Sequence, residues 1–354
     1  MTRRRFLAVA AAASTTAFTI PAVTGQGKRR ADGLGIGMHS YGAHWKLASE
    51  GGAKAPFSDA LQFLEYCRDI GAGGVQVTIA SRDFDFARRI RAKAEGSGMY
   101  FEGQLSLPKN ETDVDRFELD VRLAREAGAT VVRTACLSGR RYETFASADA
   151  FRQFRDQSWK SLVMAEPVLK RHRMRLAIEN HKDWFTAELV EILQRMKSEF
   201  VGVCVDIGNN IALLEDPVEV VTALAPFAFS THIKDMGVQE YEEGFLLSEV
   251  PLGDGFLDLK QLVGVLRRVN PAVRLNLEMI TRDPLKIPCL TPKYWIPMGE
   301  VPASRLAHAL NLMKTHRSEK PLPHVTGLSI ADQLQLEDAN VRRSLQYAQK
   351  ELSL

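Results

Sequence analysis

Four side chains of the types that bind divalent metal ions occur in the second half of the sequence, each near the end of a short apolar run. They are Glu179 in Ala-Ile-Glu-Asn-His, Asp206 in Val-Asp-Ile-Gly-Asn, His232 in Thr-His-Ile-Lys-Asp and Glu278 in Leu-Asn-Leu-Glu-Met. An unpaired carboxylate is costly to bury, and three that converge repel one another. A bound cation removes both costs. Three carboxylates and one imidazole favour Mn²⁺, Mg²⁺ or Co²⁺ and also accommodate Zn²⁺, so we predict one divalent metal ion here.

Whether these residues meet depends on the elements that carry them. From residue 33 onward, short β-rich runs that end in polar residues alternate with longer segments of helical period. The pattern predicts strands over residues 34–39, 74–79, 100–107, 131–137, 176–181, 201–207, 229–234 and 274–280. It predicts helices over residues 57–70, 113–127, 151–170, 187–196, 217–225 and 259–269. Asp216 before Pro217 is a predicted N-cap, and Gly128 is a predicted C-cap.

Eight strand–helix units indicate an α/β protein with a parallel sheet. Residues 33–280 comprise 248 residues, close to the roughly 250 of a typical (β/α)8 TIM barrel. A doubly wound open sheet is the alternative fold, but no glycine-rich phosphate loop of the required spacing follows a predicted strand. Active sites of these barrels lie at the carboxyl ends of the strands. We therefore expect the four ligands to meet at one mouth of the barrel.

Residues 281–354 lie beyond the predicted barrel. They begin with a Pro-rich loop and continue with two predicted helices, near residues 303–314 and 329–351. We expect this C-terminal helical extension to pack against the barrel or against a partner subunit in a homo-oligomer.

Residues 1–26 have the layout of an export signal. Arg3, Arg4 and Arg5 precede Phe-Leu, an Ala-rich apolar run extends to about residue 20, and Pro21 and small residues follow. Paired arginines at this place resemble a bacterial twin-arginine signal, which a receptor reads as an address. The apolar run is too short to span a bilayer comfortably. We therefore expect a periplasmic or secreted protein, delivered by the twin-arginine export machinery and without a membrane span in its mature form.

The charge balance of the chain depends on this segment. The 354 residues include 46 Lys and Arg and 43 Asp and Glu, a formal charge of +3. Six of the basic residues and none of the acidic ones lie within residues 1–30, so the rest of the chain has 40 basic and 43 acidic residues. A negative balance disfavours binding to nucleic acid phosphates.

The sequence around the four ligands resembles the xylose-isomerase-like TIM barrels, the sugar phosphate isomerase/epimerase group. Beside the four strand ends, the resemblance rests on His-Ile-Lys-Asp at 232–235 and Gly-Asp-Gly at 253–255, and it covers about residues 33–280. In ketose epimerases of this group one Mn²⁺ or similar ion is held by Glu, Asp, His and Glu, which match the four residues above in chain order. The resemblance also implies that Glu179 and Glu278 are the catalytic acid/base pair, on opposite sides of a substrate carbon.

The reaction that the resemblance implies is isomerisation or epimerisation of a sugar or keto-sugar. A metal ion stabilises the enediolate formed when an α-proton leaves, and the proton returns to the same carbon or to its neighbour. A keto-glycoside lyase or hydrolase is the close alternative, because a 3-keto sugar that loses its C2 proton can expel its C1 substituent. A metal-free glycosidase and a non-catalytic sugar-binding barrel protein remain open as well.

One departure from the family bears on a nuclease, a further alternative with this barrel. Asn209 stands where many family members have His, and asparagine is a poor metal ligand. Related apurinic endonucleases bind three zinc ions with extra histidines, and the ends of the second and third predicted strands contain none. Together with the charge balance, this argues against a nuclease and against nucleic acid as a partner.

Further residues near the predicted mouth are candidates for binding a small carbohydrate. His181 and Lys234 have the strand parity of the predicted ligands, Asn209 can hydrogen-bond a hydroxyl group, and Trp45 can stack on a sugar face. The predicted substrate-binding residues are His39, Trp45, His181, Asn209, Lys234 and Arg282. Export favours a substrate without a phosphate group.

Overall fold

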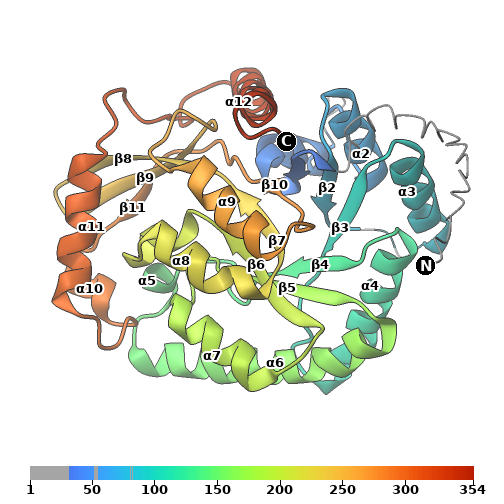
Figure 1. Ribbon diagram of the computed structural model, residues 1–354, viewed down its shortest axis with the longest axis horizontal. Coiled ribbons are helices and arrows are strands. Elements are labelled where there is room, and N and C mark those ends of the chain that lie inside the picture. Colours follow the sequence, from blue (N-terminus) through green and yellow to red (C-terminus); the bar gives the residue numbers. More distant parts are fainter. Residues whose placement is uncertain (1–31, 52–54, 80, 82) are drawn as a thin grey trace, which may run out of the picture.

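The computed structural model describes residues 32–51, 55–79, 81 and 83–354. Eight parallel strands close into a barrel, in the order β1-β10-β7-β6-β5-β4-β3-β2 (Figure 1). They are β1 (Gly35–Gly37), β2 (Gly74–Val77), β3 (Tyr100–Gln104), β4 (Val131–Thr134), β5 (Arg175–Glu179), β6 (Val201–Asp206), β7 (Ala228–Ile233) and β10 (Asn276–Leu277). The predicted (β/α)8 TIM barrel is confirmed, and each predicted strand contains one of these strands or overlaps it.

Most of the helices surround the barrel and turn apolar side chains toward its strands. The helices are α1 (Gly42–Ser49), α2 (Ala60–Asp69), α3 (Phe84–Gly96), α4 (Val114–Glu126), α5 (Arg141–Thr144), α6 (Ala148–His172), α7 (Thr186–Met196), α8 (Pro217–Leu224), α9 (Leu259–Val269), α10 (Pro292–Trp295), α11 (Ala303–Thr315) and α12 (Ile330–Glu351). The Asp216 carboxylate accepts hydrogen bonds from the backbone N–H groups of Val218 and Glu219, which confirms the predicted N-cap of α8. Gly128 follows α4 with a φ of 90°, a left-handed conformation that glycine adopts readily.

A second, antiparallel sheet follows β7 and is absent from the predicted elements. It consists of β8 (Asp235–Tyr241), β9 (Gly244–Val250) and β11 (Leu285–Ile287), with β9 in the centre. The Asp235 carboxylate fixes its base, because it accepts hydrogen bonds from the backbone N–H groups of Met236, Gly253, Gly255 and Leu257. A Cβ on Gly255 would lie 2.1 Å from Asp235 Oδ1, so a side chain does not fit there. The His-Ile-Lys-Asp and Gly-Asp-Gly segments thus hold each other in place.

One aromatic ring fills the amino-terminal end of the barrel interior. A Cβ on Gly74 would lie 2.4 Å from the ring of Tyr100, and a Cβ on Gly35 would lie 2.1 Å from its hydroxyl oxygen. The Tyr100 hydroxyl donates a hydrogen bond of 2.9 Å to the carbonyl of Leu275. Further along the strands, hydrogen bonds of 2.6 to 3.2 Å join a buried polar layer made of Gln76, Glu102, Ser230 and Asn276. Side chains therefore fill the barrel interior below its mouth.

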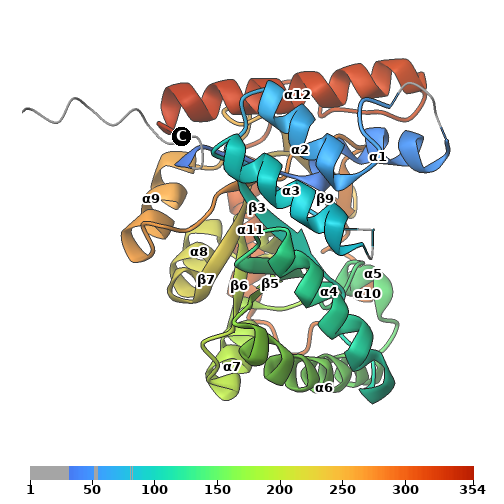
Figure 2. The ribbon, with the colours of Figure 1, turned by 90° about the vertical axis from the view of Figure 1, so that its right-hand side faces the viewer.

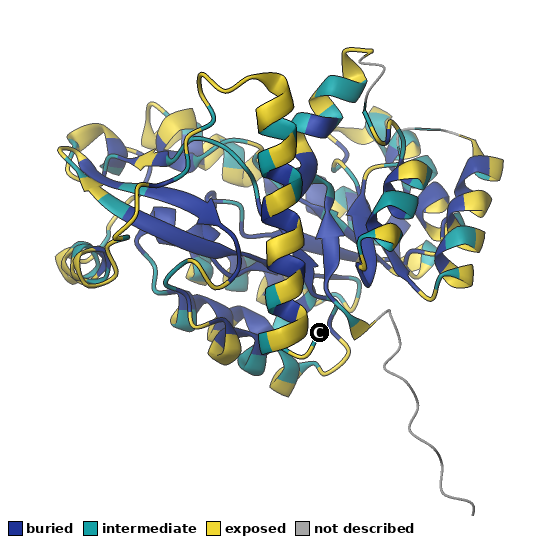
Figure 3. Cartoon of the chain, turned by 90° about the horizontal axis from the view of Figure 1, so that it is seen from above, coloured by how far each residue is buried: buried dark blue, intermediate teal, exposed yellow. Residues whose placement is uncertain are grey.

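The last helix, α12, closes the ring of helices around the barrel. It contacts α1, and Figure 2 shows it alongside α1 and α2. Lys260 of α9 lies 3.0 Å from Glu351, and the Tyr66 hydroxyl of α2 donates to Asp338 of α12. Figure 3 shows that the outward side of α12 is exposed. The predicted extension therefore packs against the barrel, where α12 occupies the place of the eighth barrel helix.

The predicted twin-arginine signal, residues 1–26, lies outside the described residues. Among the helices that the structure does describe, none has the length and apolar character needed to cross a membrane. Export and localisation stay predictions.

Glu337 of α12 caps the beginning of α1, and its removal should weaken the attachment of α12. Its carboxylate accepts hydrogen bonds from the backbone N–H of Ala43 at 2.9 Å and of His44 at 3.1 Å, and His44 Nδ1 lies 2.7 Å from it. Glu337→Ala leaves these donors buried without partners. We expect the free energy of unfolding in urea to fall by about 2–3 kcal/mol. The exposed residue Gln346 on the same helix offers the control Gln346→Ala, and equal effects of the two substitutions would contradict this role of Glu337.

Candidate active site

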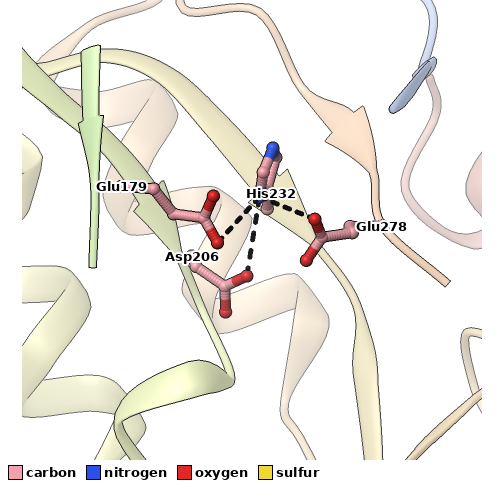
Figure 4. Close-up of side chains that lie close together, drawn as sticks. All are labelled: Glu179, Asp206, His232 and Glu278. Carbon is pink, nitrogen blue, oxygen red and sulfur yellow. Dashed lines mark ion pairs between the residues drawn. The ribbon is translucent and has the colours of Figure 1, made fainter. Parts of the chain in front are cut away.

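The four predicted ligands meet where β5, β6, β7 and β10 end (Figure 4). One ligand atom from each of Glu179, Asp206, His232 and Glu278 lies within 4.8 Å of the others. His232 Nδ1 lies 3.4 Å from Glu179 Oε1, 3.7 Å from Asp206 Oδ2 and 3.4 Å from Glu278 Oε1. All four residues are at most 3 % exposed. The barrel therefore gathers these distant residues into one buried cluster.

The two glutamates each have one oxygen held by a cation and the other turned toward His232. Glu179 Oε2 accepts hydrogen bonds from the guanidinium of Arg133, with Nε at 2.6 Å. Glu278 Oε2 accepts a hydrogen bond of 2.6 Å from Lys234 Nζ. Such contacts fix the orientation of a carboxylate while one of its oxygens stays available to a ligand.

Asp206 follows the same pattern with backbone groups. Its Oδ1 accepts hydrogen bonds from the backbone N–H of Gly208 at 2.9 Å and of Asn209 at 2.7 Å. Its Oδ2 faces His232 and also lies 2.7 Å from Lys234 Nζ. Lys234 therefore bridges two of the three carboxylates of the cluster.

The imidazole of His232 is oriented from the polar layer beneath it. His232 Nε2 lies 2.7 Å from Gln76 Oε1, and Gln76 Nε2 donates hydrogen bonds to Glu102 and Ser230. The amide oxygen of Gln76 faces Nε2, so Nε2 carries a proton. Burial lowers the pKa of His232, but Cys204, Glu278 and Glu179 outweigh burial and raise this pKa well above its ordinary value, so Nδ1 is protonated as well. A cation bound by the carboxylates would take the place of the Nδ1 proton. Nδ1 is buried and makes no hydrogen bond to any described residue.

Charged neighbours keep the buried glutamates ionised. Burial raises the pKa of Glu179, but Arg133 and His232 outweigh burial and hold this pKa well below its ordinary value. Burial also raises the pKa of Glu278, and His232 and Lys234 together hold that pKa well below its ordinary value. The cluster therefore presents carboxylates, the form that binds metal ions.

The donor set and its spacing fit one divalent cation. Atoms that share an ion at about 2.0–2.2 Å lie roughly 3.0–3.6 Å apart when they are adjacent ligands. The separations of 3.4 to 3.7 Å around His232 Nδ1 are close to this range and longer than a charge-assisted hydrogen bond of about 2.7–2.9 Å. A buried nitrogen without a hydrogen bond, facing three carboxylate oxygens, is the feature that a bound cation would satisfy.

The cluster borders a cavity of about 910 Å³, whose wall includes Arg133 and Glu278. A neighbouring cavity of about 670 Å³ shares Leu105, Ser106, Lys109 and Arg133 with it. Small-molecule sites commonly measure about 300–1,000 Å³. Both the size of the cavity and its place at the carboxyl ends of the strands suit a small-molecule substrate.

Three of the predicted substrate-binding residues line this cavity, namely His39, His181 and Arg282. His39 Nε2 lies 3.2 Å from the side-chain oxygen of Gln104, and His181 Nδ1 donates a hydrogen bond of 2.9 Å to the carbonyl of Leu137. Burial lowers the pKa of His181 to about 4, so this ring is neutral near pH 7. The guanidinium of Arg282 donates to the Glu249 carboxylate of β9 at 2.5 and 3.1 Å.

Two other predicted substrate-binding residues, Asn209 and Lys234, are buried beside the ligands. Asn209 Nδ2 donates a hydrogen bond of 2.9 Å to Glu179 Oε1. Asn209 Oδ1 accepts hydrogen bonds from Lys182 and, at 3.3 Å, from Lys234. Neither residue belongs to the cavity wall, and both hold the carboxylates in position.

Trp45 is not brought to the cavity. Its ring centroid lies 5.0 Å from that of Phe57 and 5.4 Å from that of Phe63, inside an aromatic cluster. The sequence places Trp45 after the first strand, but the backbone continues there as helix α1, which turns this side chain toward α2.

Several residues that support the cluster were not predicted. Arg133 and Gln76 interrupt the apolar strands β4 and β2, and a polar side chain within such a strand is a usable signal. Glu249 lies on the antiparallel sheet, which was not predicted, and no sequence pattern marked this residue as part of the site. Lys182, three residues after the end of β5, lies in the cavity wall. Burial and the charges of Lys234 and Arg282 lower the pKa of Lys182 to about 8.

Comparisons with known proteins agree with this architecture. A 3-oxo-isoapionate decarboxylase of Pectobacterium atrosepticum is 25% identical over 240 residues, 66% of this chain and 81% of that protein. A xylose isomerase-like TIM barrel protein of Mycobacterium smegmatis in complex with magnesium has a TM-score of 0.55 at 16% identity, over 78% of this chain and 97% of its own. The structure of D-psicose 3-epimerase in the presence of D-fructose has a TM-score of 0.55 at 13% identity, over 90% of this chain and 98% of its own.

The two structures support the fold alone, because both are less than 25% identical to this chain. The family assignment rests on residues 64–297, which match one family over well over half of the chain. The chain belongs to the xylose isomerase-like TIM barrel family.

Proposed function

We propose that this protein is a divalent-metal-dependent isomerase or epimerase of a sugar or keto-sugar. The observation that carries the proposal is the buried Nδ1 of His232 facing one oxygen each of Glu179, Asp206 and Glu278 beside the cavity. The family and the similarity to a 3-oxo-isoapionate decarboxylase support chemistry at a carbon next to a carbonyl.

Glu179, Asp206, His232 and Glu278 would hold the cation. When bound, such an ion acts as a Lewis acid that polarises a substrate carbonyl and stabilises the negative charge of an enediolate. Mn²⁺, Mg²⁺ and Co²⁺ are the preferred ions for this donor set.

The two glutamates are the proposed acid/base pair. Their Oε1 atoms lie 3.4 Å from the same nitrogen of His232 and come from two different strands of the barrel. Glu278 also lines the cavity. One carboxylate takes the α-proton and becomes a carboxylic acid, and return of this proton to the neighbouring carbon gives isomerisation. Epimerisation requires the other glutamate to take a proton from solvent and to deliver it to the same carbon from the opposite face. Arg133 and Lys234 hold the second oxygen of each glutamate and so fix the direction of both side chains.

The predicted metal site is tested by metal analysis of the purified protein. We expect about one divalent ion per chain and an increase in thermal stability with Mn²⁺, because an ion that binds only the folded state stabilises it by about 2.7 kcal/mol at 100 times its Kd. His232→Ala should remove the ion and the stabilisation by Mn²⁺. The exposed residue His308 provides the control His308→Ala. Wild-type protein that binds no ion would exclude the metal site.

The proposed proton transfer is tested by deuterium exchange from D₂O into ketoses and 3-keto-glycosides, followed by NMR. We expect Glu278→Gln and Glu179→Gln to lower the exchange rate by about 10²- to 10⁴-fold, because an amide is a poor base. Metal content is measured on the same samples to separate loss of the base from loss of the ion. Glu95→Gln, at an exposed position, is the control. Exchange that persists in both variants at the wild-type rate would refute the assignment, and release of the C1 substituent would identify the lyase alternative.

We also propose that residues 1–26 direct export through the twin-arginine machinery. Arg4→Lys with Arg5→Lys preserves the positive charge and removes the paired arginines. We expect this double variant to stay in the cytoplasm while the wild-type protein reaches the periplasm, measured by cell fractionation. Equal distribution of the two proteins would contradict the proposal.

A further inference from the structure

The wall of the 910 Å³ cavity has an excess of positive charge, in contrast to the negative balance of residues 31–354. Basic side chains outnumber acidic ones, because the wall contains Lys109, Arg133, Arg140, Lys182 and Arg282 but only Glu143 and Glu278. Several of these charges already have partners in the protein. Arg140 binds Glu143, Arg133 binds Glu179 and Arg282 binds Glu249.

Lys182 is the exception among the buried cations of this wall. It is 3 % exposed, and its ammonium group donates one hydrogen bond, to Asn209 Oδ1. No carboxylate among the described residues lies within ion-pair distance of Lys182, whereas the neighbouring Lys234 pairs with Asp206 and Glu278. A buried ammonium group without a counter-ion is strongly unfavourable. An anion from outside the protein would supply the missing counter-ion.

The backbone holds Lys182 in this place. Its φ is 65°, in the left-handed region that non-glycine residues rarely adopt. Its carbonyl accepts a hydrogen bond of 3.0 Å from the backbone N–H of Arg141, at the beginning of α5. Unfavourable backbone conformations persist where the surrounding structure enforces them, and they are frequent at binding sites.

The position of Lys182 also says where the anion lies relative to the metal ligands. The amide of Asn209 accepts a hydrogen bond from Lys182 and donates one of 2.9 Å to Glu179 Oε1. One amide group thus separates the Lys182 ammonium from a ligand of the cluster. An anionic group of the substrate that binds Lys182 would therefore lie within a few bonds of the substrate carbon that loses its proton.

We propose that the substrate is a sugar acid whose carboxylate, close to the reacting carbonyl, binds Lys182 in this cavity, with Arg282 on the same wall. The inference rests on the proposed function, because it names the class of keto-sugar on which the cluster acts. A phosphate group has the same anionic chemistry. However, in a sugar phosphate it usually lies at the far end of the carbon chain, and Lys182 lies beside the cluster.

Three ligands with the same carbons 2 to 5 test the proposal. D-fructose is neutral, 2-keto-D-gluconate replaces its C1 hydroxymethyl group with a carboxylate, and D-fructose 6-phosphate carries its anion at the other end. Calorimetric titration of the Mn²⁺-loaded protein gives the three Kd values. We expect 2-keto-D-gluconate to bind at least about tenfold more tightly than D-fructose and more tightly than D-fructose 6-phosphate.

Because a carboxylate beside a ketone can itself chelate a metal ion, the decisive comparison uses variants of Lys182. In Lys182→Met the preference for 2-keto-D-gluconate over D-fructose should fall to within about twofold. The ratio of the two Kd values is measured in the same variant, so it cancels any effect of the substitution that both ligands share. Lys182→Arg should retain a preference. The exposed residue Lys170 provides Lys170→Met, which should bind all three ligands as the wild type does.

A stability measurement separates a binding role from a structural one. Removing a buried ammonium group without a counter-ion should leave the thermal midpoint of Lys182→Met equal to or higher than that of the wild type when no ligand is present. A clear decrease of the midpoint would assign Lys182 to the fold and overturn the proposal.

The remaining outcomes are decisive as well. The proposed binding of a substrate carboxylate by Lys182 is refuted if 2-keto-D-gluconate binds no more tightly than D-fructose or does not bind. It is also refuted if Lys182→Met keeps the preference. If D-fructose 6-phosphate binds most tightly, the anion is a phosphate and the proposal is wrong. Failure of the proposed function differs from all of these, because the protein then binds no metal ion or exchanges no deuterium into any ketose.

Discussion

Mutual repulsion among three buried carboxylates is the constraint on which this site depends. Glu179, Asp206 and Glu278 share a space from which the fold excludes most water, where like charges repel strongly. Each carboxylate therefore has one oxygen held by Arg133, by backbone N–H groups or by Lys234. Asn209 and Lys234 also contact the second oxygen of Glu179 and of Asp206, respectively. The second oxygen of each stays directed at one nitrogen of His232. The geometry of a metal site follows from how the protein distributes these contacts.

The barrel meets this constraint with elements at three depths. Tyr100 fills the amino-terminal end, and the polar layer next to it orients His232 through Gln76. At the mouth, the inserted sheet brings Glu249 to Arg282 and within 3.9 Å of Lys234, so it balances two cations of the site. Asp235 anchors this sheet through backbone N–H groups directly after Lys234. An insertion outside the barrel is therefore part of the electrostatics of the site.

The local charge of the cavity differs from that of the whole chain. After residue 30 the acidic residues outnumber the basic ones, yet the cavity wall has more basic side chains than acidic ones. The overall charge balance therefore argues against a surface that binds nucleic acid, but it does not describe the electrostatic field inside a cavity. Lys182 illustrates the difference, because its charge has no counter-ion among the described residues and its surroundings are visible only in three dimensions.

Periodicity was enough to predict the barrel and the four residues at its mouth. Strand and helix patterns are local, and the carboxyl ends of parallel strands necessarily meet in a closed barrel, so Glu179, Asp206, His232 and Glu278 had to converge. The antiparallel sheet was not predicted because β8 directly continues the chain of β7 and because β11, which pairs with β9, is distant from it in sequence. Trp45 was predicted to lie at the mouth because it follows the first strand, but the direction of its side chain depends on helix α1.

The sequence by itself determined which residues could bind a cation and on which edge of the sheet they lie, because strand order and side-chain alternation are written in local patterns. Only the tertiary structure decided how each carboxylate is oriented and which buried cation of the site lacks a carboxylate partner among the described residues. Those properties come from Arg133, Gln76, Lys182 and Glu249, which reach the site from separate strands and loops. Pairing between distant side chains depends on angstrom-scale distances, and these are set by packing of the whole barrel.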